Sequence, residues 1–213
     1  MKLCQLNLTT KCNFSCPECP AGKWHNFVEK PQYLVKNADL FRFLRNLPPD
    51  EWEVELTGGE PALYDGIEEL VNWLELNGYH GEIKTNGSHK IPRTGLMKMI
   101  SAWHRWDQMP IDYDMILIVK NLFEHEADKI KYCEENNIPY RLIDRIGDTH
   151  TRYKHDIKGY IGVNPAGSIV PCPKMSANDS MPRISDNDYI IPKGYICPWC
   201  KTGHDYEIFK IGS

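Results

Sequence analysis

No apolar run in this 213-residue sequence approaches the roughly 20 residues that span a bilayer. Residues 1–10 lack both an apolar core of about seven residues and a small-residue cleavage pattern, so we expect a strand there rather than a signal peptide. An excess of basic residues is also missing, because 25 Lys and Arg stand against 29 Asp and Glu, a formal net charge of −4. The sequence therefore predicts no membrane segment and no nucleic-acid partner.

The length leaves room for one domain with a substantial core and a small appendage, but not for a second full domain. Eight cysteines without an export signal favour a reducing compartment, where thiols stay free to bind metal. We therefore expect a cytoplasmic protein whose cysteines are metal ligands or core residues rather than members of disulfides.

Strand-like and helix-like segments alternate over the first 147 residues. This pattern predicts parallel strands joined by right-handed crossovers. The predicted strands are residues 3–9, 52–56, 81–85, one within 103–109, 115–119 and 140–143. The predicted helices are residues 37–47, 67–77, 94–102 and 122–136, with Asn37 and Asn121 as N-caps of the first and last.

Two cysteines are predicted to be core residues. Cys4 shares one face of the first strand with Leu6 and Leu8. Cys133 continues the apolar stripe of the helix predicted at residues 122–136. Neither thiol is therefore expected to bind metal.

Three further cysteines, Cys12, Cys16 and Cys19, stand on a loop directly after the first predicted strand. Their close spacing suits one metal centre rather than disulfides. Three ligands leave one iron of a cubane 4Fe–4S cluster without a protein ligand, where a cofactor can chelate. Structural zinc is the alternative, but it lacks a fourth ligand at ordinary spacing, because the next histidine, His25, lies across a loop containing proline and glycine.

Two glycine-containing motifs follow the next two predicted strands. Gly58, Gly59 and Glu60 come after the second strand, and Thr85, Asn86 and Gly87 stand at the end of the third. A Gly-Gly pair lets backbone approach a ligand closely, because neither residue has a Cβ. Taken alone, each motif is more typical of an ordinary turn than of a ligand site.

In this order, the cysteine loop and the two later motifs resemble the radical S-adenosylmethionine (radical SAM) superfamily. The resemblance implies an α/β fold, a partial (β/α)6 TIM-type barrel over residues 1–147, with chemistry at the carboxyl ends of the strands. It also implies a 4Fe–4S cluster on the three cysteines and SAM on the open iron. One departure is Glu18, where the family usually has an aromatic residue.

The resemblance assigns further residues to the cofactor. Gly58, Gly59 and Glu60 are implied to contact its amino group, with Glu60 as the anionic partner of the ammonium. Thr85 and Asn86 are implied to lie near its ribose and carboxylate. Other candidates at the same barrel mouth are Lys120, Asn121 and Arg141, although Asn121 also suits a helix cap and Arg141 a structural charge.

The implied reaction is reductive cleavage of SAM to methionine and a 5′-deoxyadenosyl radical, which abstracts hydrogen from a peptide or a small polar metabolite. An electron donor such as flavodoxin or ferredoxin would supply the electron. Alternatives are a glycyl-radical activase, a nucleoside-pathway radical SAM enzyme, and a zinc-stabilised binding module without catalysis.

Residues 148–213 form the predicted appendage, which begins with a β-hairpin at residues 160–170. Cys172, Cys197 and Cys200 resemble the twitch or SPASM-type extension that holds an auxiliary iron–sulfur cluster in some radical SAM enzymes. The first cysteine of that pattern is missing, and His155 occupies its window, while His204 is a second candidate for the fourth ligand. The same residues also suit tetrahedral zinc.

Overall fold

The computed structural model describes residues 2–16, 35–120, 124–143, 160–170 and 184. Its helices are α2 (Asn37–Leu44), α3 (Ile67–Leu76) and α4 (Glu126–Glu135), with a short 3-10 helix η1 (Pro61–Leu63). Its strands are β1 (Lys2–Asn7), β2 (Trp52–Thr57), β3 (Gly81–Thr85), β4 (Met97–Ala102), β5 (Met115–Val119), β6 (Tyr140–Ile143), β7 (Tyr160–Val163) and β8 (Ile169–Val170).

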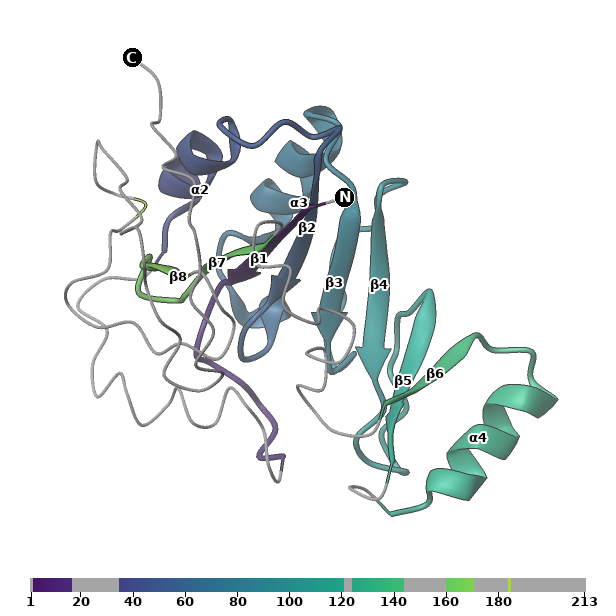
Figure 1. Ribbon diagram of the computed structural model, residues 1–213. Coiled ribbons are helices and arrows are strands. Elements are labelled where there is room, and N and C mark those ends of the chain that lie inside the picture. Colours follow the sequence, from purple (N-terminus) through teal and green to yellow (C-terminus); the bar gives the residue numbers. More distant parts are fainter. Residues whose placement is uncertain (1, 17–34, 121–123, 144–159, 171–183, 185–213) are drawn as a thin grey trace, which may run out of the picture.

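All described strands belong to one sheet in the order β6-β5-β4-β3-β2-β1-β7-β8. Every neighbouring pair from β6 to β7 is parallel, and only β8 runs antiparallel to β7. Figure 1 shows α2 and α3 beside β1 and β2, and α4 at the other end beside β5 and β6. The predicted α/β fold of partial-barrel type is therefore confirmed, as is the hairpin at residues 160–170.

The position of that hairpin was not predicted. β7 pairs with β1 on the side away from β2, so it extends the barrel sheet. The division into residues 1–147 and 148–213 stays a prediction, but a strand from the second part lies in the sheet of the first. Among the described residues, no helix is long and apolar enough to cross a membrane.

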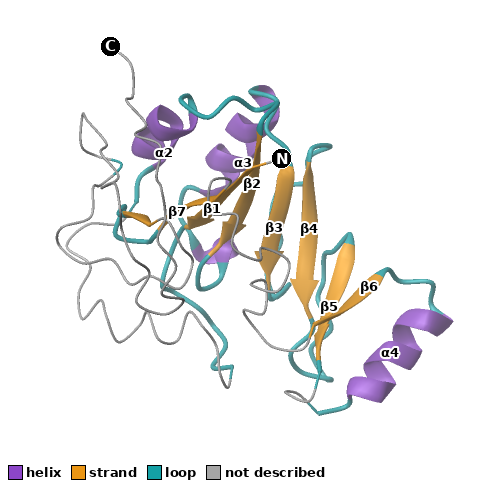
Figure 2. Cartoon of the chain, viewed as in Figure 1, coloured by secondary structure: helices purple, strands orange, loops and turns teal. Residues whose placement is uncertain are grey.

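The main core lies between the sheet and the helices α2 and α3 (Figure 2). In and directly after β1, Cys4, Leu6 and Leu8 are at most 1% exposed. Full burial of a leucine side chain contributes about 1.5–3 kcal/mol. On the α3 side, this core consists of the buried residues Ile67, Leu70, Val71 and Leu74.

Both predicted core thiols are confirmed. Cys4 and Cys133 are each 0% exposed, and Cys133 packs between α4 and β5 with Ile116 and Ile118. Burial raises the pKa of both thiols, so they stay protonated and unsuited to metal binding at neutral pH.

The predicted helix over residues 94–102 and the predicted strand within 103–109 are both wrong. Residues 97–102 form β4, whose Met97 and Met99 are 3% and 2% exposed, while Lys98 between them is exposed. Leucine and methionine are good helix formers, which favoured a helix, but pairing with β3 and β5 on both sides outweighs that propensity. In the described loops 86–96 and 103–114, no helix joins these strands.

An arginine connects the two loops on either side of β4. Arg93 donates through Nε to the Asp112 carboxylate at 2.8 Å, and its Nη1 lies 2.6 Å from Asp114 Oδ1. Asp114 Oδ2 also accepts from the backbone N–H of Met99 in β4 at 2.6 Å. These contacts tie both loops to the sheet where no crossover helix is present.

Two helix starts also differ from prediction. α4 begins at Glu126 rather than residue 122, and Asn121 lies outside the described residues. Asn37 is the first residue of α2 rather than its cap. Its amide donates to Gly66 O at 2.8 Å and Glu69 Oε2 at 2.6 Å, so it joins α2 to α3.

Candidate active site

The cysteine loop leaves β1 at the edge of the sheet where the parallel strands end (Figure 1). Cys12 and Cys16 are half-buried cysteines on this loop. Cys19, the third predicted ligand, lies outside the described residues. Among the described residues there is no group of three His, Cys, Asp or Glu side chains suited to a metal ion.

The Gly-Gly pair holds the start of the cysteine loop. The backbone N–H of Gly59 donates to Thr9 O at 2.7 Å, and that of Glu60 donates to Lys11 O at 2.8 Å. A Cβ on Gly59 would stand 2.2 Å from Lys11 O, and Gly58 has a φ of +130°. Glycine is needed at both positions because backbone packs directly against backbone.

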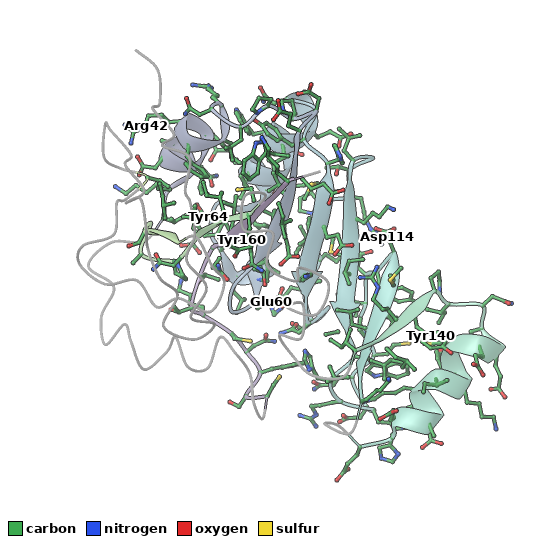
Figure 3. The ribbon with its side chains drawn as sticks, in the orientation of Figure 1. Arg42, Glu60, Tyr64, Asp114, Tyr140 and Tyr160 are labelled. Atoms are coloured by element: carbon green, nitrogen blue, oxygen red, sulfur yellow. The ribbon has the colours of Figure 1, made fainter. Side chains whose placement is uncertain are left out.

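Glu60 is 0% exposed, and its carboxylate joins the second motif to the third. Oε1 accepts from Ala62 N at 3.0 Å and Thr85 Oγ1 at 2.6 Å, and Oε2 accepts from Asn86 N at 2.7 Å. Figure 3 shows Glu60 at the same edge of the sheet as the cysteine loop. The carboxylate thus fixes the end of β3 relative to β2.

Asn86 carries the connection on to the cysteine loop. Its Nδ2 donates to Asn13 Oδ1 at 2.8 Å and lies 3.9 Å from Cys12 Sγ. The backbone N–H of Phe14 also donates to Cys12 Sγ, at 3.4 Å. The three predicted motifs therefore form one hydrogen-bonded unit, with N–H groups directed at a cysteine sulfur.

A histidine that the sequence analysis did not single out reaches the second cysteine. His104 follows β4, and its Nδ1 lies 3.5 Å from Cys16 Sγ. Burial, and then the positive charge of Lys129, lowers the pKa of His104 to about 4, so its ring is neutral near pH 7. Because the fourth strand was predicted within 103–109, His104 was not expected to follow the carboxyl end of that strand.

A second polar group crosses four neighbouring strands. Tyr160 of β7 donates to Gln5 of β1 at 2.7 Å, and Gln5 donates to Glu55 of β2 at 2.5 Å. Glu55 also forms an ion pair with Lys84 of β3. Figure 3 labels Tyr160 at one end of this row. The sequence analysis treated these strands only as packing elements and missed the row.

The other predicted site residues are not joined to this unit by the hydrogen bonds above. Lys120 follows β5, with its N–H donating to Ile143 O at 2.8 Å, and Arg141 lies in β6 opposite Leu117. Both belong to strands beyond β4, away from β2 and β3. Outside the described residues lie Cys19, Asn121, His155, Cys172, Cys197, Cys200 and His204.

No family model matches the chain. Over 78 residues it is 38% identical to the 7-carboxy-7-deazaguanine synthase of Clostridium acetobutylicum, covering 36% of this chain and 34% of that protein. Over 74 residues it is 35% identical to the GTP 3′,8-cyclase of Aquifex aeolicus, covering 33% of this chain and 22% of that protein. The aligned part is thus about a third of the first relative and less of the second.

Among solved structures, the chain is similar to Streptococcus suis SuiB. The structure bound to S-adenosylmethionine gives a TM-score of 0.59 at 15% identity, over 86% of this chain and 61% of that one. The structure bound to the precursor peptide SuiA gives 0.60 at 13% identity, over 86% and 62%. At these low sequence identities, the similarity to SuiB shows a shared fold and nothing more.

The fold and the site together define a class of protein, the α/β partial barrels that carry a cysteine loop at the carboxyl ends of their strands. The two partial sequence matches agree with the resemblance to the radical SAM superfamily that the three motifs carry, and the solved structures show the same fold.

Proposed function

We propose that this chain is a radical SAM enzyme with a 4Fe–4S cluster on Cys12, Cys16 and Cys19. The observation that supports this most is the hydrogen-bonded unit at the edge of the sheet, in which Glu60 and Asn86 connect all three motifs. With SAM, a bound cluster would supply one-electron cleavage of a C–S bond to give methionine and a 5′-deoxyadenosyl radical.

The surroundings of the described cysteines suit thiolate ligands. An iron-bound thiolate carries no proton and can only accept hydrogen bonds. The backbone N–H of Phe14 and the Asn86 amide both donate to Cys12 Sγ. Such donors also offset the negative charge that a cluster brings into a half-buried loop.

The Gly-Gly segment suits a cofactor amino group in a specific way. The N–H groups of Gly59 and Glu60 already donate to the cysteine loop. An ammonium is a donor and needs acceptors, so the carbonyl oxygens of Gly58 and Gly59 are the groups that would receive it. Because the Glu60 carboxylate is completely buried, we propose that this side chain positions the segment and does not contact the cofactor directly.

The proposed substrate is a peptide or a small polar metabolite from which hydrogen is abstracted, with flavodoxin or ferredoxin as the electron donor. SuiB, whose fold this chain shares, has been solved with a precursor peptide. GTP, in the name of the second relative, is a small polar molecule. Both substrate classes therefore belong in the first screen.

We further propose that Cys172, Cys197 and Cys200, with His155, hold a second metal centre in residues 148–213, an iron–sulfur cluster or zinc. The support is the spacing of these residues in the sequence. Metal analysis of Cys172→Ala/Cys197→Ala/Cys200→Ala should show loss of either about four irons or one zinc. Unchanged metal content would contradict this second site.

The test of the proposed function is SAM cleavage without added substrate. Anaerobically reconstituted full-length protein is incubated with SAM and dithionite, and 5′-deoxyadenosine and methionine are quantified. Wild type should form both products, and Cys16→Ala should form neither. Cys133→Ala is the matched control, since this thiol is buried in the core beside α4, and it should retain activity.

Wild-type protein that carries iron but forms no 5′-deoxyadenosine would contradict the proposal. Zinc in place of iron at the first site would favour the binding-module alternative instead.

A further inference from the structure

His104 is held against the cysteine loop from two directions. Its Nδ1 lies 3.5 Å from Cys16 Sγ, and its ring meets the Phe14 ring edge-on, with centroids 5.6 Å apart and planes at 85°. Phe14 is also the residue whose backbone N–H donates to Cys12 Sγ. The histidine therefore contacts the segment between the first two cysteines as well as the second cysteine itself.

The backbone of His104 is fixed from the opposite side by α4. Lys129 is only 1% exposed, and its Nζ donates to His104 O at 3.1 Å. The same ammonium lies 5.9 Å from the centre of the Trp103 ring, which is 3% exposed. Because a buried lysine and a buried tryptophan flank the histidine, its position is set by the fold rather than by a free surface loop.

The direction of the Cys16 contact follows from chemistry. When Cys16 is a thiol, either its sulfur or the His104 imidazole can donate the proton of the hydrogen bond. A thiolate bound to iron has no proton to give, so the contact then requires a proton on His104 Nδ1. Together with the donors to Cys12, this places N–H groups on the sulfurs of both cysteines described in this loop.

We propose that His104 donates a hydrogen bond from Nδ1 to the Cys16 thiolate and thereby raises the reduction potential of the cluster. This inference rests on the proposed function, since it needs the cluster on Cys12, Cys16 and Cys19. A donor to a ligand sulfur stabilises the reduced cluster, which carries one more negative charge than the oxidised form. His104 is thus a positioning and tuning residue rather than a catalytic one.

The test is a redox titration of reconstituted full-length protein, with the reduced cluster followed by electron paramagnetic resonance. In His104→Phe the ring shape is kept and the donor is lost. At a fixed potential, the ratio of reduced to oxidised cluster should fall about tenfold, a shift of about 59 mV to more negative values for a one-electron couple. Iron content should not change.

Two further variants make the result specific. Asparagine carries its amide nitrogen where histidine carries Nδ1, so His104→Asn should restore most of the wild-type potential. His80→Phe is the matched control, because His80 directly precedes β3 and lies at the opposite edge of the sheet. Its potential should equal that of wild type.

Each remaining outcome overturns a different statement. An unchanged potential in His104→Phe, with iron retained, would refute the hydrogen bond and leave the proposed function intact. Loss of iron from His104→Phe and His104→Asn alike would make His104 a ligand and refute the tuning role. Wild-type protein without iron would refute the proposed function itself.

Discussion

Replacing Glu60 by glutamine tests how the motifs are joined. The carboxylate accepts three hydrogen bonds while 0% exposed. A glutamine amide has one oxygen, so its NH₂ group must face either Asn86 N–H or Ala62 N–H. In both orientations a buried backbone donor loses its acceptor, which costs about 1–3 kcal/mol.

We therefore expect Glu60→Gln to lower the free energy of unfolding by about 2 kcal/mol. For a chain of 213 residues this corresponds to a fall in melting temperature of about 4–8 °C. Urea and thermal unfolding of metal-free protein, followed by circular dichroism, measure the loss without any contribution from cluster binding.

Thr85→Ser is the matched control, because it keeps the hydroxyl that donates to Glu60 Oε1 and accepts from the backbone N–H of Gly87. It should cost about 1 kcal/mol, from the loss of one buried methyl group. If Glu60→Gln is as stable as wild type, or costs no more than Thr85→Ser, the carboxylate does not hold the strand ends together and the reasoning fails.

Three further substitutions have distinct expected outcomes. Gly59→Ala should lower the free energy of unfolding by about 1–3 kcal/mol and reduce iron loading, because the new Cβ would stand 2.2 Å from the backbone of the cysteine loop. Gly78→Ala is its control, because Gly78 has a φ of +75° but open space around it. It should cost about 1–2 kcal/mol of stability and leave the iron content unchanged. Burial raises the pKa of Tyr79 from 10.0 to about 12, so between pH 10 and pH 12 wild type should lose about 3 kcal/mol more stability than Tyr79→Phe in urea titrations. Lys84→Met removes the cation that pairs with Glu55, whose side chain is 7% exposed, and should lower the free energy of unfolding in urea by about 2 kcal/mol. The double variant Glu55→Gln/Lys84→Met should recover most of this loss, because it leaves no unpaired charge.

The parallel sheet could be predicted because its strands combine alternating or continuous apolar patterns with clear turns. β4 could not, since Met97 and Met99 suit a helix as well as a strand, and only pairing with β3 and β5 decides between them. The attachment of β7 to β1 is a contact between residues about 155 apart, and no local pattern encodes it.

The candidate site likewise contains residues that the sequence predicts and residues that only the fold reveals. Cys12, Cys16, Gly59 and Asn86 could be found from spacing, because each motif is local in the sequence. His104 could not, because its relation to Cys16 depends on the position of β4 and on a contact spanning 88 residues. With β4 at residues 97–102, His104 follows a strand end just as Gly58 and Asn86 do, which is the signal a corrected assignment would provide.

The central claim is tested most directly by counting iron and acid-labile sulfide in anaerobically reconstituted protein. The account predicts that Cys12→Ala/Cys16→Ala/Cys19→Ala contains about four irons and four sulfides fewer per chain than wild type. Cys4→Ala, which removes a buried core thiol, should contain as much as wild type. Wild-type protein without iron, or a triple variant with as much iron and sulfide as wild type, would contradict the account.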